Sequence, residues 1–387
     1  MERVTFVAPV NLAVIKYWGK RNEELILPIN DSLSATLDTE HLCAKTTVMI
    51  SPDFEQDKIW LNGCEESIEN ARLQNCLREV RKRSQLPDKQ ENWKVHICSE
   101  NNFPTSAGLA SSAAGYACLT VALAKLFNVQ GDISAIARCG SGSACRSIYG
   151  GFVRWYMGDN IDGSDSISKE VFDTNHWPDM RILILVVNDT KKKVSSSEGM
   201  KRCYHTSPFL KYRAENTVPL RIEQMQEAIQ DRNFEKFAEL TMKDSNEMHA
   251  ACAAAYPPCF YMNDTSHRII ELVHAYNTAH GEIKAAYTFD AGPNATLFVL
   301  EKDVCELYAV INNYFLFVDD RQTKDQIGKS LPGASASSEL LKKINIEKQP
   351  LGKLKYVIHT RVGTGPKQVL DSENHLLDNQ GFPKKLY

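Results

Sequence analysis

The sequence lacks a charge excess of either sign and the marks of a secreted, membrane or zinc-binding protein. Its 387 residues carry a formal net charge of −3 at pH 7, so no basic field indicates nucleic acid or an anionic membrane as a partner. No apolar run approaches the length that spans a bilayer, and the first residues form no apolar signal segment. The eleven cysteines form no CxxC pair and no Cys/His cluster with zinc spacing. We therefore expect a cytoplasmic protein with reduced thiols that binds neither nucleic acid nor membrane.

The sequence also contains no internal repeat and no low-complexity tract. Hydrophobic residues make up 43% of the chain and charged residues 24%, which is the composition of an ordinary globular protein. The length predicts one large or two ordinary domains with ample chain for a core. Because the net charge is small, an anionic ligand would have to be held by local groups.

What the sequence does contain is a stretch of small residues before a long apolar helical pattern. Residues 104–115 read Pro-Thr-Ser-Ala-Gly-Leu-Ala-Ser-Ser-Ala-Ala-Gly. They match neither the P-loop, because no Lys follows the second Gly, nor GxGxxG. Small residues let backbone N–H groups approach a phosphate, and a helix N-terminus adds unpaired donors. Ser111 and Ser112 would lie about one turn into the helix, within reach of phosphate or bound Mg²⁺. A phosphate loop and a close-packed helix entry fit these residues about equally.

Two further segments place cations among aromatic, glycine or serine residues. Lys16 and Lys20 flank Tyr-Trp-Gly at the end of an apolar run that begins at Asn11. They are either lysines that solvate the end of a buried strand, which we favour for a lysine pair taken alone, or cations that project into a polyanion site. Arg146 is the one charged residue in the segment 140–151. That segment is either a flexible turn or a second anion cradle, in which the planar guanidinium suits a carboxylate or a phosphate.

A carboxylate follows an apolar stretch near residue 290. Asp290 precedes a sharp Ala-Gly-Pro turn, where aspartates commonly accept backbone N–H bonds. On spacing alone we favour that structural interpretation about two to one over a carboxylate aimed into a cleft. Ser196 and Ser197 lie near an expected helix start, where they could donate to an anion. Arg72, in the expected helix 72–83, could lie on a plain exposed surface.

Hydrophobic periodicity predicts strands followed by a helix-rich second half. Strands are expected at 4–8, 44–50, 57–61, 94–98, 151–157, 181–187 and 355–361. Helices are expected at 72–83, 207–232 with a break near Pro219, 234–255, 266–280, 303–315 and 337–345. The shift toward helical patterns predicts two units, an N-terminal lobe of residues 1–180 and a C-terminal lobe of residues 181–387.

Taken together, these segments resemble the mevalonate diphosphate decarboxylase family of the GHMP kinase superfamily. The matching pieces are 13–20, 101–115, 140–147, 242–246 and 287–294, which run in the family's order over nearly the whole chain. Their wording is closer to animal than to bacterial members. The resemblance implies an α+β fold of two GHMP-type lobes, the first like ribosomal protein S5, and a homodimer. It also implies ATP- and Mg²⁺-dependent decarboxylation of (R)-5-diphosphomevalonate to isopentenyl diphosphate, ADP, phosphate and CO₂, in the mevalonate pathway to isoprenoids and sterols, cholesterol included.

The resemblance also implies roles for individual residues. Asp290 matches the carboxylate beside the C3 hydroxyl of the substrate and is expected to act as general base. Arg146 matches the residue that fixes the substrate carboxylate, and Lys16 matches a lysine near the reacting centre. Substrate contacts are implied for Tyr17, Trp18, Gly19, Lys20, Arg72, Ser141, Gly142, Ser143, Ala144, Cys145, Arg146, Ser196 and Ser197. ATP phosphate contacts are implied for Pro104, Ala107, Gly108, Leu109, Ser111 and Ser112, the two serines also being candidate Mg²⁺ contacts.

Two other functions fit parts of the same pattern. One is a GHMP small-molecule kinase, such as a mevalonate or phosphomevalonate kinase, that stops after phosphorylation. Kinases of the superfamily often place an Asp where Arg146 stands, which argues for the decarboxylase. The other is a silent relative that binds ligand without reaction, and the presence of Asp290, Arg146 and Lys16 together counts against it.

Overall fold

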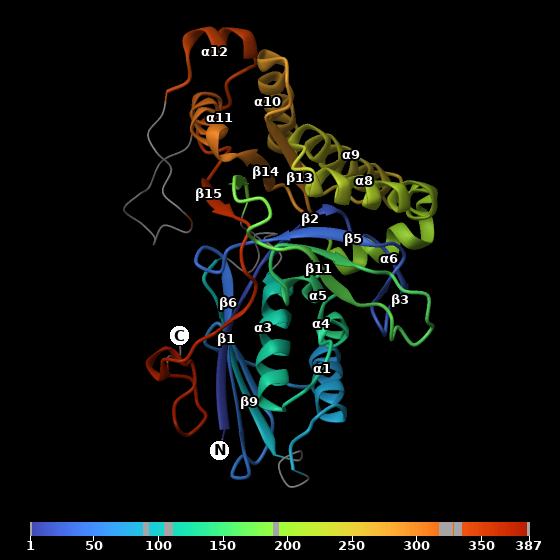
Figure 1. Cartoon of the computed structure of the whole chain (residues 1–387), viewed down its shortest axis with the longest axis vertical. Coiled ribbons are helices and arrows are strands. Elements are labelled where there is room, and N and C mark those ends of the chain that lie inside the picture. The colour runs from blue at the N-terminus through green and yellow to red at the C-terminus, as the bar shows by residue number, and fades with distance from the viewer. Residues whose placement is uncertain are drawn as a thin grey trace.

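The computed structural model describes residues 2–87, 93–103, 111–188, 193–316, 328 and 335–384. In that part of the chain the strands form a six-stranded sheet, two four-stranded sheets and a two-stranded ribbon. The six-stranded N-terminal sheet lies in the lower half of the molecule. One four-stranded sheet, here called the middle sheet, crosses the centre, and the other, the C-terminal sheet, lies above it (Figure 1). This two-lobed α+β arrangement confirms the fold class that the family resemblance implies.

The strands are mostly antiparallel to their neighbours. In the N-terminal sheet, only the pair β7 and β9 is parallel among the described pairs. In spatial order that sheet contains β16 (Lys367–Gln368), β1 (Glu2–Pro9), β6 (Cys43–Ser51), β9 (Lys94–Asn101), β7 (Lys58–Leu61) and β8 (Cys64–Glu66). The middle sheet contains β11 (Ser168–Phe172), β10 (Phe152–Trp155), β5 (Ser32–Thr36) and β2 (Asn11–Ile15). The C-terminal sheet contains β13 (Ala285–Phe289), β14 (Ala295–Leu300), β12 (Met180–Val186) and β15 (Tyr356–Arg361), and the ribbon pairs β3 (Lys20–Asn22) with β4 (Leu27–Pro28).

The helices of the N-terminal lobe are α1 (Ala71–Lys82), α3 (Ser111–Leu126), α4 (Ser134–Gly140) and α5 (Ala144–Ser147). Helix α1 begins at Asn70, whose side chain accepts hydrogen bonds from the next turn, and it buries one apolar face. Helix α3 is buried on most of its circumference and is rich in alanine, so it packs closely against β1 and β6. The N-terminus of α3 therefore lies at a fixed place beside the middle of the molecule.

The helices of the C-terminal lobe are α6 (Ser196–Thr206), α7 (Pro208–Tyr212), a π-helical segment η1 (Arg213–Thr217), α8 (Val218–Gln230), α9 (Phe234–Ala253), α10 (Asp264–His280), α11 (Glu301–Tyr314) and α12 (Ser338–Ile344), and a 3₁₀ turn η2 (Ser372–Asn374) comes near the end. The break expected near Pro219 is the π-helical segment, which ends immediately before α8. Helix α10 begins with a capping box of Asn263 and Ser266 and ends at Gly281, which is left-handed. Helices α8 and α9 lie across the middle sheet (Figure 1).

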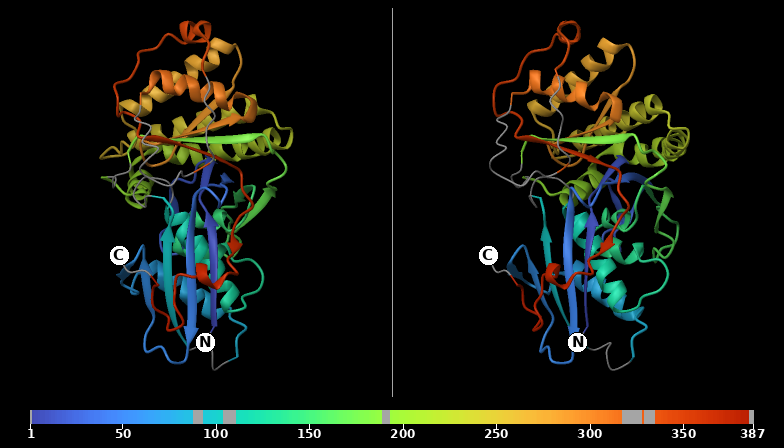
Figure 2. Two further views of the ribbon diagram at one scale, coloured as in Figure 1. Left: turned by 90° about the vertical axis from the view of Figure 1, so that its left-hand side faces the viewer. Right: turned by 60° about the vertical axis from the view of Figure 1, so that its left-hand side comes forward.

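The chain after β15 returns to the N-terminal lobe. Strand β16 pairs with β1, and Figure 2 shows this last segment, in red, running down along the N-terminal sheet. The Arg3 side chain donates hydrogen bonds to the backbone carbonyls of Leu377 and Asp378. The lobe boundary expected near residue 180 falls at Met180, the first residue of β12. The division of the chain into lobes 1–180 and 181–387 remains a proposal.

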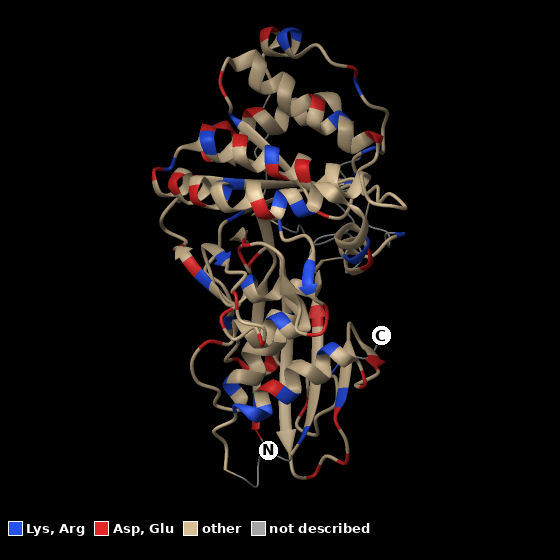
Figure 3. Ribbon diagram, turned by 90° about the vertical axis from the view of Figure 1, so that its right-hand side faces the viewer, with Lys and Arg blue, Asp and Glu red and all other residues tan. Residues whose placement is uncertain are grey.

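Charges of both signs are scattered over the two lobes (Figure 3). All eleven cysteines are free thiols. Among the described residues, no helix is both long enough and apolar enough to cross a membrane.

Candidate active site

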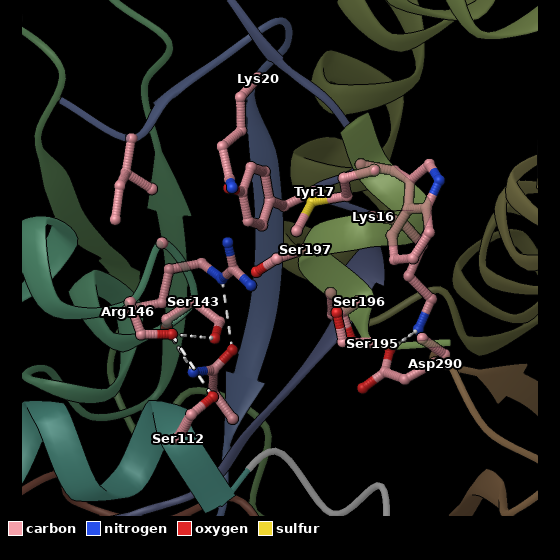
Figure 4. Close-up of a pocket in the computed structure, with 18 of the residues that line it drawn as sticks. Lys16, Tyr17, Lys20, Ser112, Ser143, Arg146, Ser195, Ser196, Ser197 and Asp290 are labelled. Carbon is pink, nitrogen blue, oxygen red and sulfur yellow. Dashed lines mark hydrogen bonds and ion pairs between the residues drawn. The ribbon is translucent and has the colours of Figure 1, made fainter. Parts of the chain in front are cut away.

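A cavity of about 530 Å³ is lined by residues of both lobes, among them Asn11 and Ala13 of β2 in the middle sheet. Its walls include the end of β2, the turn before α5, the first turns of α3 and α6, and the turn after β13. Figure 4 shows side chains from all of these segments pointing into one space. Among the charged side chains of the described lining, four are cationic (Lys16, Lys20, Arg72 and Arg146) and one is acidic (Asp290). This lining suits a ligand with several negative charges.

Lys16 and Asp290 form an ion pair at one end of the cavity. The Lys16 Nζ lies 2.6 Å from Asp290 Oδ1, and the two side chains are 4% and 35% exposed. Lys16 follows an irregularity in the β2 register between Ala13 and Ile15, which is how a bulge re-aims the next side chains. Asp290 follows β13 in a tight turn, where the Gly292 N–H donates to the Asp290 carbonyl at 2.7 Å. The pair thus combines a buried ammonium with a carboxylate that a ligand can reach.

Arg146 lies on α5, and only 2% of it is exposed. Its Nη1 donates to Ser32 Oγ at 2.6 Å, and its Nε donates to Ser34 Oγ at 3.0 Å and to Asn11 Oδ1 at 3.3 Å. Burial lowers the pKa of Arg146, while the nearby Asp290 charge acts in the opposite direction. These partners are neutral oxygens, and among the described residues no carboxylate forms an ion pair with this guanidinium. A buried cation so placed suits an anionic group of a ligand.

Serine hydroxyls lie beside the guanidinium groups of the cavity. The Ser141 Oγ lies 3.5 Å from Ser112 Oγ and 3.3 Å from Ser143 Oγ. Arg72 Nη2 donates to Ser197 Oγ at 2.9 Å. Helices α3 and α6 both begin at residues that line the cavity, and helix N-termini present backbone donors and positive dipole ends. This donor set fits phosphate groups.

Aromatic residues and Lys20 complete the walls. The Tyr17 ring packs edge-on against Trp155 with centroids 4.7 Å apart, and burial raises the pKa of Tyr17. Its hydroxyl is buried without a hydrogen-bond partner among the described residues. A side chain at Gly142 would approach the Tyr17 ring to 2.7 Å, so glycine permits this contact. Lys20 Nζ pairs with Glu23 Oε2 at 2.6 Å, a contact for which a bound anion would compete.

The described residues include no group of three or more His, Cys, Asp or Glu side chains that could hold a metal ion alone. A divalent cation at this cavity would therefore take most of its ligands from phosphate oxygens. Serine hydroxyls at the start of α3 would add hard oxygen ligands of the kind that Mg²⁺ prefers. The residues present fit a magnesium–nucleotide complex in that form.

The structure brings most of the predicted residues to this cavity. Those that line it are Lys16, Tyr17, Trp18, Lys20, Arg72, Ser111, Ser112, Ser141, Gly142, Ser143, Arg146, Ser196, Ser197 and Asp290. Gly19, Ala144 and Cys145 are not part of the lining, and the Cys145 thiol instead donates to the Gly142 carbonyl. Pro104, Ala107, Gly108 and Leu109 lie outside the described residues.

Sequence reasoning missed other residues of the cavity. Asn11, Ser195, Met200 and Met248 also line it. Ser195 could have been found from the sequence, because a serine directly before a helical pattern is a helix N-cap signal. In the structure, its side chain caps α6 by accepting a hydrogen bond from the Glu198 N–H at 3.1 Å. The two methionines carried none, since they come from different helices and meet only in the folded chain.

Comparisons with known proteins agree with this geometry. Family models described as the diphosphomevalonate decarboxylase-like N-terminal domain and the mevalonate 5-diphosphate decarboxylase C-terminal domain match residues 8–168 and 182–369. Diphosphomevalonate decarboxylase of Danio rerio is 51% identical over 393 residues, covering 100% of this chain and 97% of the relative. A crystal structure of mevalonate 5-diphosphate decarboxylase is 43% identical, with a TM-score of 0.85, and covers 98% of this chain and 99% of that one. A structure of MDDEF in complex with MVAPP, AMPPCP and magnesium is 32% identical, with a TM-score of 0.74 and coverage of 95% and 98%.

Proposed function

Because the chain belongs to the mevalonate diphosphate decarboxylase family, we propose that the cavity lined by both of its lobes is where the family's reaction takes place. That reaction is the ATP-dependent decarboxylation of (R)-5-diphosphomevalonate to isopentenyl diphosphate in the mevalonate pathway. The observation that carries the proposal is that one cavity contains both the buried guanidinium of Arg146 and the Lys16–Asp290 ion pair. At one end, Arg146 has no carboxylate partner among the described residues, and the Lys16–Asp290 pair lies at the other end. The substrate has a carboxylate for the first and a tertiary hydroxyl for the second.

In the first step, we assign Asp290 the role of general base. Its carboxylate accepts the proton of the C3 hydroxyl while the hydroxyl oxygen bonds to the γ-phosphorus of ATP and ADP departs. The Lys16 ammonium, 2.6 Å from the carboxylate, holds Asp290 in place and offsets negative charge on the transferring phosphoryl group. A positioned base of this kind typically contributes about 10²–10⁴-fold to the rate.

In the second step, we assign Arg146 the role of holding the substrate carboxylate. The C3–O bond breaks and its electron pair leaves with phosphate, so positive charge builds at C3. The electron pair of the C1–C2 bond then forms the new double bond, and CO₂ departs. Arg146 fixes the carboxylate so that the breaking C–C bond is aligned with the leaving phosphate. Once Asp290 has passed the proton from the first step to solvent, its restored negative charge stabilises positive charge at C3.

The remaining cations and hydroxyls are assigned to phosphate groups. Lys20, Arg72 and the serines at 141, 143, 196 and 197 line the cavity and form the donor set for the substrate diphosphate. Ser111 and Ser112, at the start of α3, are assigned to the phosphates of ATP and to Mg²⁺. Bound Mg²⁺ supplies positive charge that offsets the charge of the phosphates. The relative solved with MVAPP, AMPPCP and magnesium supports these ligands.

The test of the function is the release of CO₂ measured against ADP. The purified protein is incubated with ATP, Mg²⁺ and diphosphomevalonate, and ADP, CO₂ and isopentenyl diphosphate are measured together. One CO₂ per ADP is expected. Release of ADP without CO₂ would instead identify a kinase that stops after phosphorylation, the alternative that the comparisons do not favour.

Ser112→Ala is expected to raise the KM for ATP about three- to tenfold, with the KM for diphosphomevalonate within twofold of normal. The reason is the loss of one hydroxyl bond to phosphate, which contributes about 1 kcal/mol. The measurement is steady-state kinetics with each substrate varied. Thr120→Val is the control, because Thr120 is a buried hydroxyl on the same helix that does not line the cavity. An unchanged KM for ATP would leave Ser112 a structural residue only.

The homodimer and the cytoplasmic location stay predictions. The free state of all eleven cysteines supports a reducing compartment. Measurement of mass in solution would decide the oligomeric state.

A further inference from the structure

A single turn of helix α9, residues 244–246, contacts the two chain segments that carry Lys16 and Asp290. Asp244 Oδ1 accepts a hydrogen bond from the Lys16 backbone N–H at 2.7 Å. Ser245 Oγ accepts one from the Phe289 backbone N–H at 3.0 Å. Phe289 is the last residue of β13 and directly precedes Asp290. Adjacent residues of one helix therefore hold the backbone on both sides of the ion pair, one in each lobe.

The Asp244 contact is part of a buried ionic network. Asp244 is fully buried and accepts two hydrogen bonds from Arg213 Nη2, at 2.7 and 2.8 Å, and one from Arg221 Nη1 at 3.1 Å. Arg213 Nη2 also donates to the Lys16 carbonyl at 3.3 Å. Both backbone polar groups of Lys16 are thus bound to the network. A buried ionic network of this kind is weak evidence for added stability. Its hydrogen bonds instead hold the backbone of Lys16 in place.

The following residues of α9 hold β13 at further points. Asn246 and the Tyr287 hydroxyl exchange hydrogen bonds of 3.1 and 3.2 Å. Nearly one turn later, the buried His249 ring hydrogen-bonds the backbone of Phe289. Burial, together with the Lys16 charge, lowers the pKa of His249 to about 4. The ring is therefore neutral near pH 7 and places no second positive charge beside Lys16. The end of β13 is therefore attached to α9 at Tyr287 and at Phe289.

We propose that Ser245, with Asp244, is a positioning residue that sets where the Asp290 carboxylate stands relative to Lys16 and to the bound substrate. Neither residue lines the cavity, so each acts through the backbone that it holds. The inference rests on the proposed function, in which Asp290 is the general base. Its basis is that a displacement of about 1 Å in a catalytic group can cost on the order of 10²-fold in rate.

Ser245→Ala is the test, because it removes one hydrogen bond and leaves the ionic network intact. We expect kcat to fall about three- to tenfold, while the Kd for diphosphomevalonate, measured directly by calorimetry, stays within twofold. Ser245→Cys, which keeps the size and a weak acceptor, is expected to restore part of kcat. This split between rate and binding separates positioning from a general loss of structure.

Thr241→Val is the matched control. Thr241 lies one turn earlier on α9, is equally buried, and donates its hydroxyl bond to Phe237 of its own helix rather than to β13. It is expected to lower Tm by about as much as Ser245→Ala and to leave kcat within twofold. Equal kcat values for the two variants would overturn the positioning role. Asp290→Asn is measured in parallel, because retained activity in that variant would overturn the general-base role on which this inference rests. The ratio of CO₂ to ADP released by the unchanged protein tests the proposed function separately.

Discussion

Asp290→Asn is expected to lower kcat about 10²- to 10⁴-fold while diphosphomevalonate binds as tightly as before or more tightly. The range is that of a general base removed from its site, and loss of the charge that stabilises C3 in the second step adds to it. Asn keeps the size of the side chain and removes a negative charge from a cavity that receives an anion. Substrate affinity is therefore expected to survive the loss of turnover. Single-turnover kinetics and calorimetric binding measure the two effects separately.

Asp303→Asn is the control for that experiment. Asp303 is also paired with a lysine, Lys284, at 3.0 Å, but it lies on α11 and does not line the cavity. It tests whether loss of any Lys–Asp pair in the C-terminal lobe disturbs the reaction. Half of the normal kcat retained in Asp290→Asn would remove this carboxylate from the mechanism.

Local patterns predicted the elements well where one element carries its own signal. The helix expected at 72–83 is α1 (Ala71–Lys82), and the helix expected at 234–255 is α9 (Phe234–Ala253). The segment 140–151, which fits a flexible turn or an anion cradle from its sequence, contains the short helix α5, whose few residues cannot show a period. Strand order was out of reach, because β1 pairs with β16, some 360 residues later in the chain.

The site shows the same division between local and distant information. Taken alone, Asp290 fitted an ordinary turn, and the resemblance to a family assigned it chemistry. What no local pattern contains is the convergence of Lys16 with Asp290, since 274 residues separate them. Asp244 lies in the segment 242–246 that resembles the family, but no pattern indicated its role. A buried charge in a helix can be interpreted only once its partners Arg213 and Arg221 are placed.

Arg146→Lys is expected to lower kcat at least about tenfold, which corresponds to about 1.4 kcal/mol of transition-state stabilisation. Lysine keeps the positive charge and loses the planar fork. In the structure, Nε and Nη1 are bound to Asn11, Ser32 and Ser34, and these bonds orient the guanidinium before substrate arrives. An ammonium at this position cannot form the same bonds and hold a carboxylate in a fixed plane. The C1–C2 bond would then lose its alignment with the leaving phosphate.

The comparison variant is Arg154→Lys, because Arg154 obtains its carboxylate partners, Asp31 and Glu223, from the protein itself. It does not line the cavity, so its kcat is expected within twofold of normal. A substrate analogue without the carboxylate completes the test. The unchanged protein is expected to bind it at least about tenfold more weakly than diphosphomevalonate, since Arg146 would be left buried without an anion, a loss of 1.4 kcal/mol or more. The carboxylate role of Arg146 is wrong if the analogue binds as tightly as substrate, or if Arg146→Lys turns over at the normal rate.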